Sequence, residues 1–175
     1  MGDEQRVSWQ ELLAGSREAF EHGTDLTVAV EEEFALLDTH TLELTNRFED
    51  IFGASRDTDF ADHVVGELIA SEIEIRTGRC ESFGEAAAAM QERRSQLHGL
   101  AREVGLALGA TGTHPWSRWQ DQRIIDTPHY RRNDEILRYV VWRNNTFGLH
   151  VHVGVNGPDR AIRVTSALRN YLPEL

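Results

Sequence analysis

The sequence predicts an α+β fold in which helices cover strands that carry acidic residues. Segments with the alternating pattern of strands are interleaved with segments that have the spacing of amphipathic helices. The chain has 175 residues, of which 40% are hydrophobic and 27% charged, so it can bury a substantial core. Neither an internal repeat nor a low-complexity linker interrupts it. These observations favour one mixed domain.

The first expected helix covers residues 8–23. Ser8 lies three residues before Glu11, which is the spacing of a capping box. Apolar side chains fall near one face of this helix: Trp9, Leu12, Leu13 and Phe20. The segment is therefore expected to form a short amphipathic helix ahead of the main fold.

A first acidic strand is expected within residues 25–38, which read DLTVAVEEEFALLD. Successive side chains of a strand point to opposite faces. Glu31 and Glu33 therefore share one face, and Glu32 falls on the other face beside Phe34.

A second acidic strand is expected within residues 66–78, GELIASEIEIRTG. Ile73 and Ile75 face one way, and three charged side chains face the other: Glu72, Glu74 and Arg76. A long helix should follow over residues 82–109, because Ser82 and Glu85 repeat the capping spacing. Its expected apolar set is Phe83, Ala86, Ala87, Met90, Leu97, Ala101, Val104 and Leu108.

The remaining elements are shorter. GATGTHPW, residues 109–116, predicts a glycine-rich connection with a short strand, and a short helix is expected near residues 131–140. FGLHVHVGV, residues 147–155, predicts a strand with His150 and His152 on one face and apolar residues on the other. Gly157 and Pro158 then suit the start of a last helix.

Composition excludes several classes of partner. The net charge of −11 disfavours nucleic acid and anionic membrane surfaces, because both would repel the chain. No apolar stretch reaches the length of a membrane span, and the opening MGDEQRVSWQ has no signal-peptide pattern. The single cysteine, Cys80, cannot form an intramolecular disulfide and suits a reducing compartment. A cytoplasmic location is expected.

Three features could together hold a divalent cation: Glu31 with Glu33, Glu67 with Glu72 and Glu74, and His150 with His152. Each alone also fits a solvated strand face, a salt bridge to an arginine or a hydrogen-bonded histidine pair. Buried carboxylates lose hydration, and a cation would offset that loss. Carboxylates with one or two imidazoles suit Mg²⁺ or Mn²⁺ better than Zn²⁺. No Walker or dinucleotide-binding pattern is present.

Four motifs, in this order and spacing, resemble the type 2 glutamate–cysteine ligase family, also called carboxylate–amine ligases: TVAVEEEFALLD, ELIASEIEIRTGRC, GATGTHPW and FGLHVHVGV. The resemblance covers Leu26 to the C-terminus. It implies a fold similar to glutamine synthetase, with an antiparallel curved sheet whose concave face gathers acidic residues around Mg²⁺ and ATP. It also implies that the sheet of this chain is incomplete.

The resemblance further implies roles for individual residues. Glu31, Glu33, Glu67 and Glu74 match the acidic metal ligands, and His150 and His152 match the strand that reaches the metal–nucleotide complex. Arg76 is expected to clamp a carboxylate or phosphate, or else to pair with Glu72 or Glu74. Thr113 and His114 are expected at the substrate, although His114 could instead brace the turn before Pro115.

The implied reaction is ATP-dependent amide formation through an acyl phosphate. The partners would be a small carboxylate such as glutamate and an amine such as cysteine, and the metal would neutralise charge on the phosphate. Residues 1–25 fall outside the resemblance as a helical extension, and residues 26–175 would be the N-terminal part of the catalytic domain. In the family pattern further strands follow this segment. A sheet without them would have an open edge and uncovered apolar surface, so a homo-oligomer is expected.

Two other classes remain open. Two histidines on one strand with a carboxylate also describe an iron site of an oxygenase or isomerase. That interpretation leaves the paired glutamates unexplained. The chain could also be a catalytically silent binding module.

Overall fold

The computed structural model describes residues 8–174, so the first seven residues of the expected N-terminal extension lie outside the described part. The chain forms two compact units. Residues 29–152 make the larger unit, and the segments before and after them make the smaller one.

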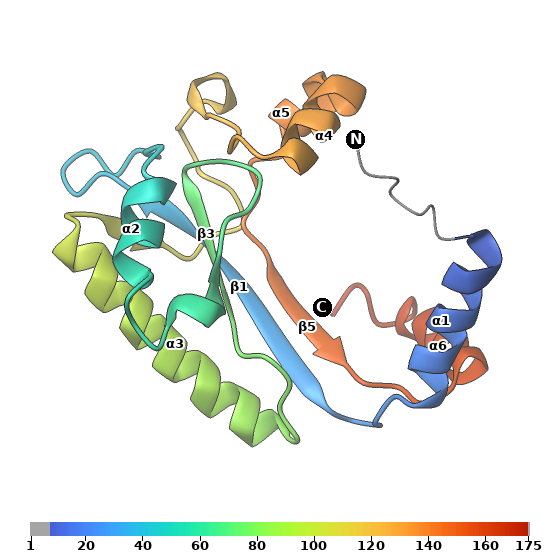
Figure 1. Ribbon diagram of the computed structural model, residues 1–175. Coiled ribbons are helices and arrows are strands. Elements are labelled where there is room, and N and C mark those ends of the chain that lie inside the picture. The colour runs from blue at the N-terminus through green and yellow to red at the C-terminus, as the bar shows by residue number, and fades with distance from the viewer. Residues whose placement is uncertain (1–7, 175) are drawn as a thin grey trace. The chain divides into compact units, whose positions relative to one another are not determined.

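The larger unit is built on an open antiparallel sheet, as expected for an α+β fold (Figure 1). Its five strands are β1 (Val28–Leu37), β2 (Val64–Val65), β3 (Glu72–Arg76), β4 (Ala107–Gly109) and β5 (Leu149–Val153). They lie in the order β2-β3-β1-β4, and β5 also pairs with β1. The long strand β1 is therefore the centre of the sheet.

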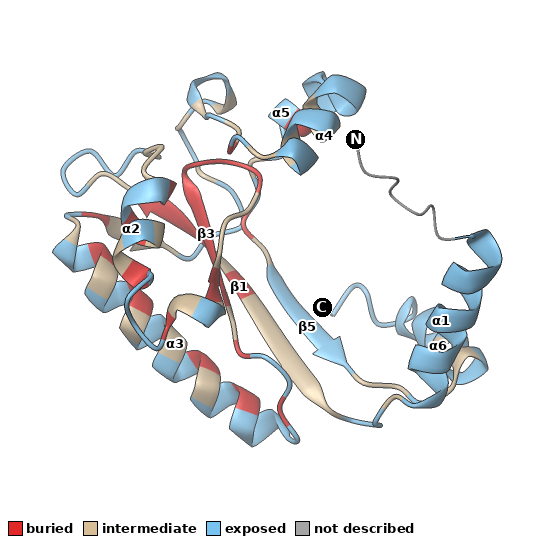
Figure 2. Cartoon of the chain, in the orientation of Figure 1, coloured by how far each residue is buried: buried red, intermediate tan, exposed pale blue. Residues whose placement is uncertain are grey.

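Alternation along the strands produces one apolar face, as predicted. Phe34 on β1 lies opposite Ile73 on β3, and both are buried. Helices α2 (Phe48–Ser55) and α3 (Phe83–Glu103) cover this face (Figures 1 and 2). The core between the sheet and these helices contains Leu36, Ile51, Ile75, Met90, Leu97 and Ala101.

Glu32 also points into this helix-covered face. It is buried, and Arg94 of α3 pairs with it, with Arg94 Nε donating to Glu32 Oε2 at 2.6 Å. The same arginine lies over the ring of Phe34 at 6.0 Å from the centroid. A charged residue on the apolar face of β1 is thus matched by the helix that covers it.

The helix α3 begins as expected, because the Ser82 hydroxyl accepts a hydrogen bond from the Glu85 N–H. It ends at Glu103, so the last expected position, Leu108, belongs to β4. Phe83 was expected in the apolar set, but its side chain is 76% exposed. It is the first residue of the helix, ahead of the turns that pack on the sheet.

Strand β5 is the exposed part of the sheet (Figure 2). Its apolar side chains Leu149, Val151 and Val153 are 63, 60 and 53% exposed. Among the described strands, β5 pairs with β1 alone, so its other backbone edge is open.

A short helix, η1 (Ala61–His63), lies directly before β2. Three helices follow β4: η2 (Trp119–Asp121), α4 (Pro128–Leu137) and α5 (Tyr139–Trp142). The helix expected near residues 131–140 is divided, because Arg138 between α4 and α5 has a φ of 42°. This φ lies in the left-handed region, where an α-helix cannot continue.

The smaller unit contains α1 (Trp9–Glu21) and α6 (Pro158–Leu168), which contact each other. The predicted capping box is present, since Ser8 and Glu11 exchange side-chain and backbone hydrogen bonds. Apolar side chains on and after α6 are exposed: Ile162, Leu168, Tyr171 and Leu172. In residues 8–174, no helix combines the length and apolar character that crossing a membrane requires.

Candidate functional site

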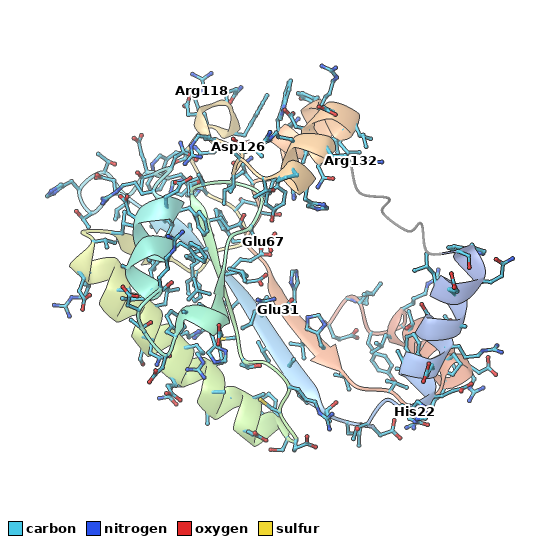
Figure 3. All side chains as sticks on the ribbon, viewed as in Figure 1. His22, Glu31, Glu67, Arg118, Asp126 and Arg132 are labelled. Carbon is cyan, nitrogen blue, oxygen red and sulfur yellow. The ribbon has the colours of Figure 1, made fainter. Side chains whose placement is uncertain are left out.

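Three adjacent strands build the face opposite the helices. Glu31 and Glu33 of β1 both point to it, because they are two residues apart on the strand. Glu74 of β3 and His150 of β5 point to the same face. The register places Glu33 directly opposite Glu74 and Glu31 opposite Arg76. Figure 3 labels Glu31 on this face and Glu67 close to it.

The carboxylates converge into two overlapping groups. One contains Glu31, Glu74 and His150, and the other contains Glu33, Glu67 and Glu74. In each group one ligand atom per residue lies within 4.8 Å of the others. All five residues were proposed as metal ligands from the sequence, and Glu74 belongs to both groups.

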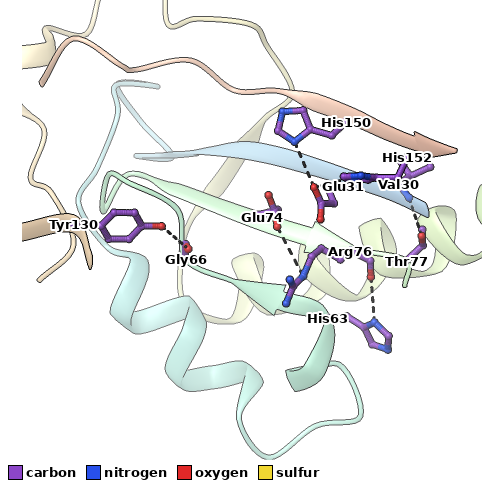
Figure 4. Close-up of polar contacts among 10 residues, drawn as sticks. All are labelled: Val30, Glu31, His63, Gly66, Glu74, Arg76, Thr77, Tyr130, His150 and His152. Carbon is purple, nitrogen blue, oxygen red and sulfur yellow. Dashed lines mark hydrogen bonds and ion pairs between the residues drawn. The ribbon is translucent and has the colours of Figure 1, made fainter. Parts of the chain in front are cut away.

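The histidines of β5 both approach Glu31 (Figure 4). His152 Nε2 lies 2.9 Å and His150 Nδ1 lies 3.5 Å from Glu31 Oε2. The hydrogen bond from His152 holds the pKa of Glu31 below its usual value. Strand alternation therefore directs both imidazoles to one carboxylate.

Glu67 reaches the face from the segment between β2 and β3. Burial raises its pKa, and the charges of Glu33 and Glu31 raise it further. The hydroxyl of Tyr130, on α4, donates to the carbonyl oxygen of the adjacent Gly66 at 3.3 Å (Figure 4). Burial and the neighbouring glutamates raise the pKa of Tyr130 to about 12, so this hydroxyl keeps its proton.

The carboxyl groups of Glu72 and Glu74 on β3 are buried and lie among other carboxylates. Burial, with the charges of Glu67, Glu31 and Glu33, raises the pKa of Glu74 to about 7. Burial and the charges of Glu33 and Glu67 raise the pKa of Glu72 to about 9, and Glu72 Oε1 has no hydrogen-bond partner among the described residues. Strand parity placed Glu72 on this face, and the sequence named it with Glu67 and Glu74 among the features that could hold a cation. The ligands implied by the family resemblance did not include it.

Gly148 is a residue that sequence reasoning missed. Its N–H donates to Glu33 Oε2, and its carbonyl oxygen accepts from the Glu33 N–H at 3.0 Å. A Cβ atom at this position would lie 2.8 Å from His150 Nε2 and 3.1 Å from Glu33 Oε2. The lack of a side chain thus leaves room for both groups.

Arg76 lies on the same face, with its Nε 3.8 Å from Glu74 Oε1 and its side chain 43% exposed. This long contact is one of the two arrangements expected for Arg76. Its planar guanidinium remains accessible to an anion at the edge of the carboxylate group.

Thr113 and His114 are not gathered into this group. Thr113 forms an isolated bridge with Thr146. His114 Nε2 lies 2.8 Å from the Leu42 carbonyl oxygen, and its Nδ1 accepts from the Ser117 N–H at 3.0 Å. One ring nitrogen of His114 therefore has a partner in the turn that follows it, and the other has a partner in the distant Leu42 segment. These hydrogen bonds favour the structural alternative for His114.

The arrangement suits a hard divalent cation. Glu33 and Glu74 form a cross-strand pair of like charges, which is unfavourable unless a proton or a cation lies between them. The donors of both groups are carboxylate oxygens with at most one imidazole. This set fits Mg²⁺ or Mn²⁺ and lacks the thiolates and multiple imidazoles that favour Zn²⁺.

Two named proteins are similar to most of this chain. A protein of Rubrobacter xylanophilus, provisionally named glutamate–cysteine ligase 2-2, is 40% identical over 158 residues, covering 89% of this chain and 40% of the relative. A glutamate–cysteine ligase of Halobacterium salinarum is 35% identical over 161 residues, covering 92% of this chain and 44% of the relative. The chain thus spans less than half the length of these relatives.

A family sequence model also matches most of the chain. Residues 27–175 match the sequence model of glutamate-cysteine ligase family 2 (GCS2), and they contain every residue of the carboxylate and histidine face. The chain therefore belongs to glutamate–cysteine ligase family 2.

Proposed function

We propose that this chain carries the metal- and nucleotide-binding face of an ATP-dependent carboxylate–amine ligase of the glutamate–cysteine type. The observation that carries the proposal is the pair of ligand groups that share Glu74. Two adjacent cation sites suit a reaction that brings the phosphates of ATP against a substrate carboxylate, because both are anionic.

The proposed ligands of Mg²⁺ are Glu31, Glu74 and His150 in one group and Glu33, Glu67 and Glu74 in the other. The cations would supply neutralisation of phosphate and carboxylate charge. Glu31 is held in place by His152, and Glu33 by the Gly148 N–H, so both carboxylates are oriented before any ligand binds.

Arg76 is proposed to bind an anionic oxygen of phosphate or substrate beside these ligands. His152 is proposed to approach the nucleotide from the end of β5. The ligand role predicted for Thr113 and His114 stays a prediction, and the hydrogen bonds of His114 favour a structural role for that residue.

The proposed reaction has two steps. The γ-carboxylate of glutamate attacks the γ-phosphorus of ATP, which releases ADP and forms a mixed carboxylic–phosphoric anhydride. The amino group of the second substrate, proposed to be cysteine, then attacks the carbonyl carbon. Phosphate leaves, the nitrogen loses a proton, and an amide remains.

An iron-dependent oxygenase is supported less well. Its usual ligand set is two histidines and one carboxylate on one face of the metal. Here each potential ligand group contains at most one histidine, and His152 is hydrogen bonded to Glu31. The carboxylate-rich groups therefore favour the ligase.

Metal binding by the chain tests the first part of the proposal. We expect Mn²⁺ titration, followed by electron paramagnetic resonance, to show binding that Mg²⁺ displaces and that Glu74→Gln weakens by at least tenfold, because Glu74 serves both groups. Glu81→Gln is the matched control, since Glu81 is exposed and pairs with Arg79 away from this face. Equal affinities of the two variants would overturn the assignment.

Trapping of the acyl phosphate tests the ligase chemistry. Incubation of the protein with Mg-ATP, glutamate and hydroxylamine should yield glutamyl hydroxamate and one phosphate for each hydroxamate formed. Metal and nucleotide binding without hydroxamate would instead indicate the silent binding module.

A further inference from the structure

Among the members of the two ligand groups, Glu67 alone lies outside the strands. It belongs to the segment that joins β2 to β3, and it is only partly buried. A side chain on a connecting segment can point in several directions unless neighbouring groups hold its backbone. The orientation of Glu67 towards Glu33 and Glu74 therefore needs a structural cause other than strand alternation.

The backbone directly after Glu67 is paired with the segment that leads to α4. The Ile125 N–H donates to the Leu68 carbonyl oxygen at 3.0 Å. Ile69 and Ile124 form an antiparallel bridge next to this bond. The pairing holds the chain on one side of Glu67, but it does not include the peptide unit before that residue.

The side chain of Tyr130 holds the backbone on the other side of Glu67. Its hydroxyl donates to the Gly66 carbonyl oxygen at 3.3 Å (Figure 4). This oxygen and the Glu67 nitrogen belong to one planar peptide unit, so the hydrogen bond restrains the direction in which Glu67 leaves the turn. Gly66 has no Cβ atom to restrict rotation about its own bonds, which makes a restraint from outside more effective.

The ring of Tyr130 is itself held in place. Its backbone N–H donates at 3.1 Å to the hydroxyl of Thr127, which caps the start of α4. The ring packs against two clusters of buried apolar side chains, and it meets the imidazole of His129 with centroids 5.4 Å apart. The hydroxyl is therefore directed at Gly66 before any ligand binds.

We infer that Tyr130 is a positioning residue for the cation group formed by Glu33, Glu67 and Glu74. The inference rests on the proposed function, in which these three carboxylates bind Mg²⁺. In this role Tyr130 contacts neither the cation nor a substrate. It acts through the Gly66 peptide unit, which keeps the Glu67 carboxylate within reach of the other two.

The other cation group has no such dependence. Strands β1, β3 and β5 position its three members, Glu31, Glu74 and His150. Loss of the Tyr130 hydroxyl should therefore weaken one group and spare the other. A general loosening of the fold would instead weaken both, so the difference between the groups identifies the positioning role.

The test is Mn²⁺ titration of the full chain, followed by electron paramagnetic resonance. Tyr130→Phe removes only the hydroxyl, so it should raise the Kd of one bound ion about threefold to tenfold and leave the Kd of the other unchanged. Tyr139→Phe is the matched control, because its hydroxyl lies on exposed α5 and accepts from Arg143 at 2.9 Å. Equal Kd values for the two variants, or equal losses at both ions, would overturn the inference.

Glu67→Gln tests whether Tyr130 acts through Glu67. This variant should weaken binding of the same ion that Tyr130→Phe weakens. Adding Tyr130→Phe to Glu67→Gln should then cause no further increase in that Kd, because a carboxylate that has been removed gains nothing from being positioned. A further increase of about threefold or more in the double variant would show that Tyr130 acts by another route, which overturns the positioning role.

The outcomes also separate this inference from the ligase proposal. If the wild-type chain binds no Mn²⁺, both the cation groups and the positioning role are overturned. If the wild type binds Mn²⁺ and Tyr130→Phe behaves as the control does, the positioning role alone is overturned. If the Kd values change as expected but no hydroxamate forms, the positioning role stands and the ligase chemistry is overturned.

Discussion

Glu72 is a carboxyl group that the fold has almost removed from water, with only 3% of the residue exposed. Its pKa rises from an ordinary value of 4.5 to about 9, and that of Glu74 rises to about 7. Both groups therefore bind protons more tightly in the folded chain than in the unfolded chain. Folding and proton uptake are coupled at these two residues.

This coupling predicts how stability depends on pH in the absence of metal. The tighter proton binding by Glu72 and Glu74 in the folded chain contributes to the free energy of unfolding. This contribution is complete below about pH 4.5, and it is lost as the pH rises through about 7 for Glu74 and about 9 for Glu72. We expect the free energy of unfolding from urea titrations in chelator to fall between pH 5 and pH 9. Added Mg²⁺ should reduce this fall, and a flat profile would contradict the raised pKa values.

Glu72→Gln should stabilise the metal-free chain at pH 8. The amide keeps the volume and stays neutral without taking up a proton, so we expect a gain of about 1–3 kcal/mol in the free energy of unfolding. Glu81→Gln, at an exposed position, should leave this free energy unchanged. Destabilisation by Glu72→Gln would show that the carboxylate is compensated by a partner.

At the scale of elements, Glu32 and Arg94 join the central strand to its covering helix. Arg94→Met keeps most of the aliphatic stem but leaves Glu32 buried without its partner. We expect a loss of about 1–3 kcal/mol in urea unfolding, less than for a fully buried pair because the Arg94 side chain is 54% exposed. Adding Glu32→Gln to Arg94→Met should restore part of this loss. If the losses of the two single variants instead add up in the double variant, the two side chains do not form a stabilising ion pair.

The turn that leads to Glu67 depends on a glycine. A Cβ atom on Gly66 would lie 2.5 Å from Phe48 Cζ, in the core under α2. Gly66→Ala should therefore destabilise the chain by about 1–3 kcal/mol. Gly53→Ala within α2 is the control, because its Cβ atom meets nothing within 4 Å and alanine favours a helix. Similar thermal melting of the two variants would contradict the close contact.

Strand alternation explains which parts of the face were predictable. The orientations of Glu31, Glu33 and Glu74 follow from two-residue spacing within a strand, which is a local property of the sequence. Glu67 lies outside the strands, and only the family resemblance predicted that it would lie at this face. The contact of Tyr130 with Gly66 joins residues 64 positions apart, which no local pattern specifies.

The division of the expected helix at Arg138 and the bridge between Ile69 and Ile124 were also beyond local patterns. His114 shows the converse limit. A histidine in a glycine-rich loop has the same local sequence whether it binds substrate or braces a turn, and only the partners of its ring nitrogens distinguish the two.

For the whole molecule, the open edge of β5 predicts association. An unpaired strand edge with exposed Leu149, Val151 and Val153 can pair with another chain. We expect sedimentation of the isolated chain to show larger species as its concentration rises. Val151→Lys should reduce them, whereas Val140→Lys, exposed on α5 away from the sheet, should not. A monomer at all concentrations would contradict this expectation.

The position of Glu74 in both ligand groups has a consequence for the stoichiometry of proton release. With a pKa of about 7, this carboxyl group is about half protonated at neutral pH, and a cation that binds it must displace that proton. A second cation then meets a carboxylate that has already lost its proton. In weakly buffered solution near pH 7, binding of Mn²⁺ at Glu74 should therefore acidify the solution, and Glu74→Gln should reduce that acidification.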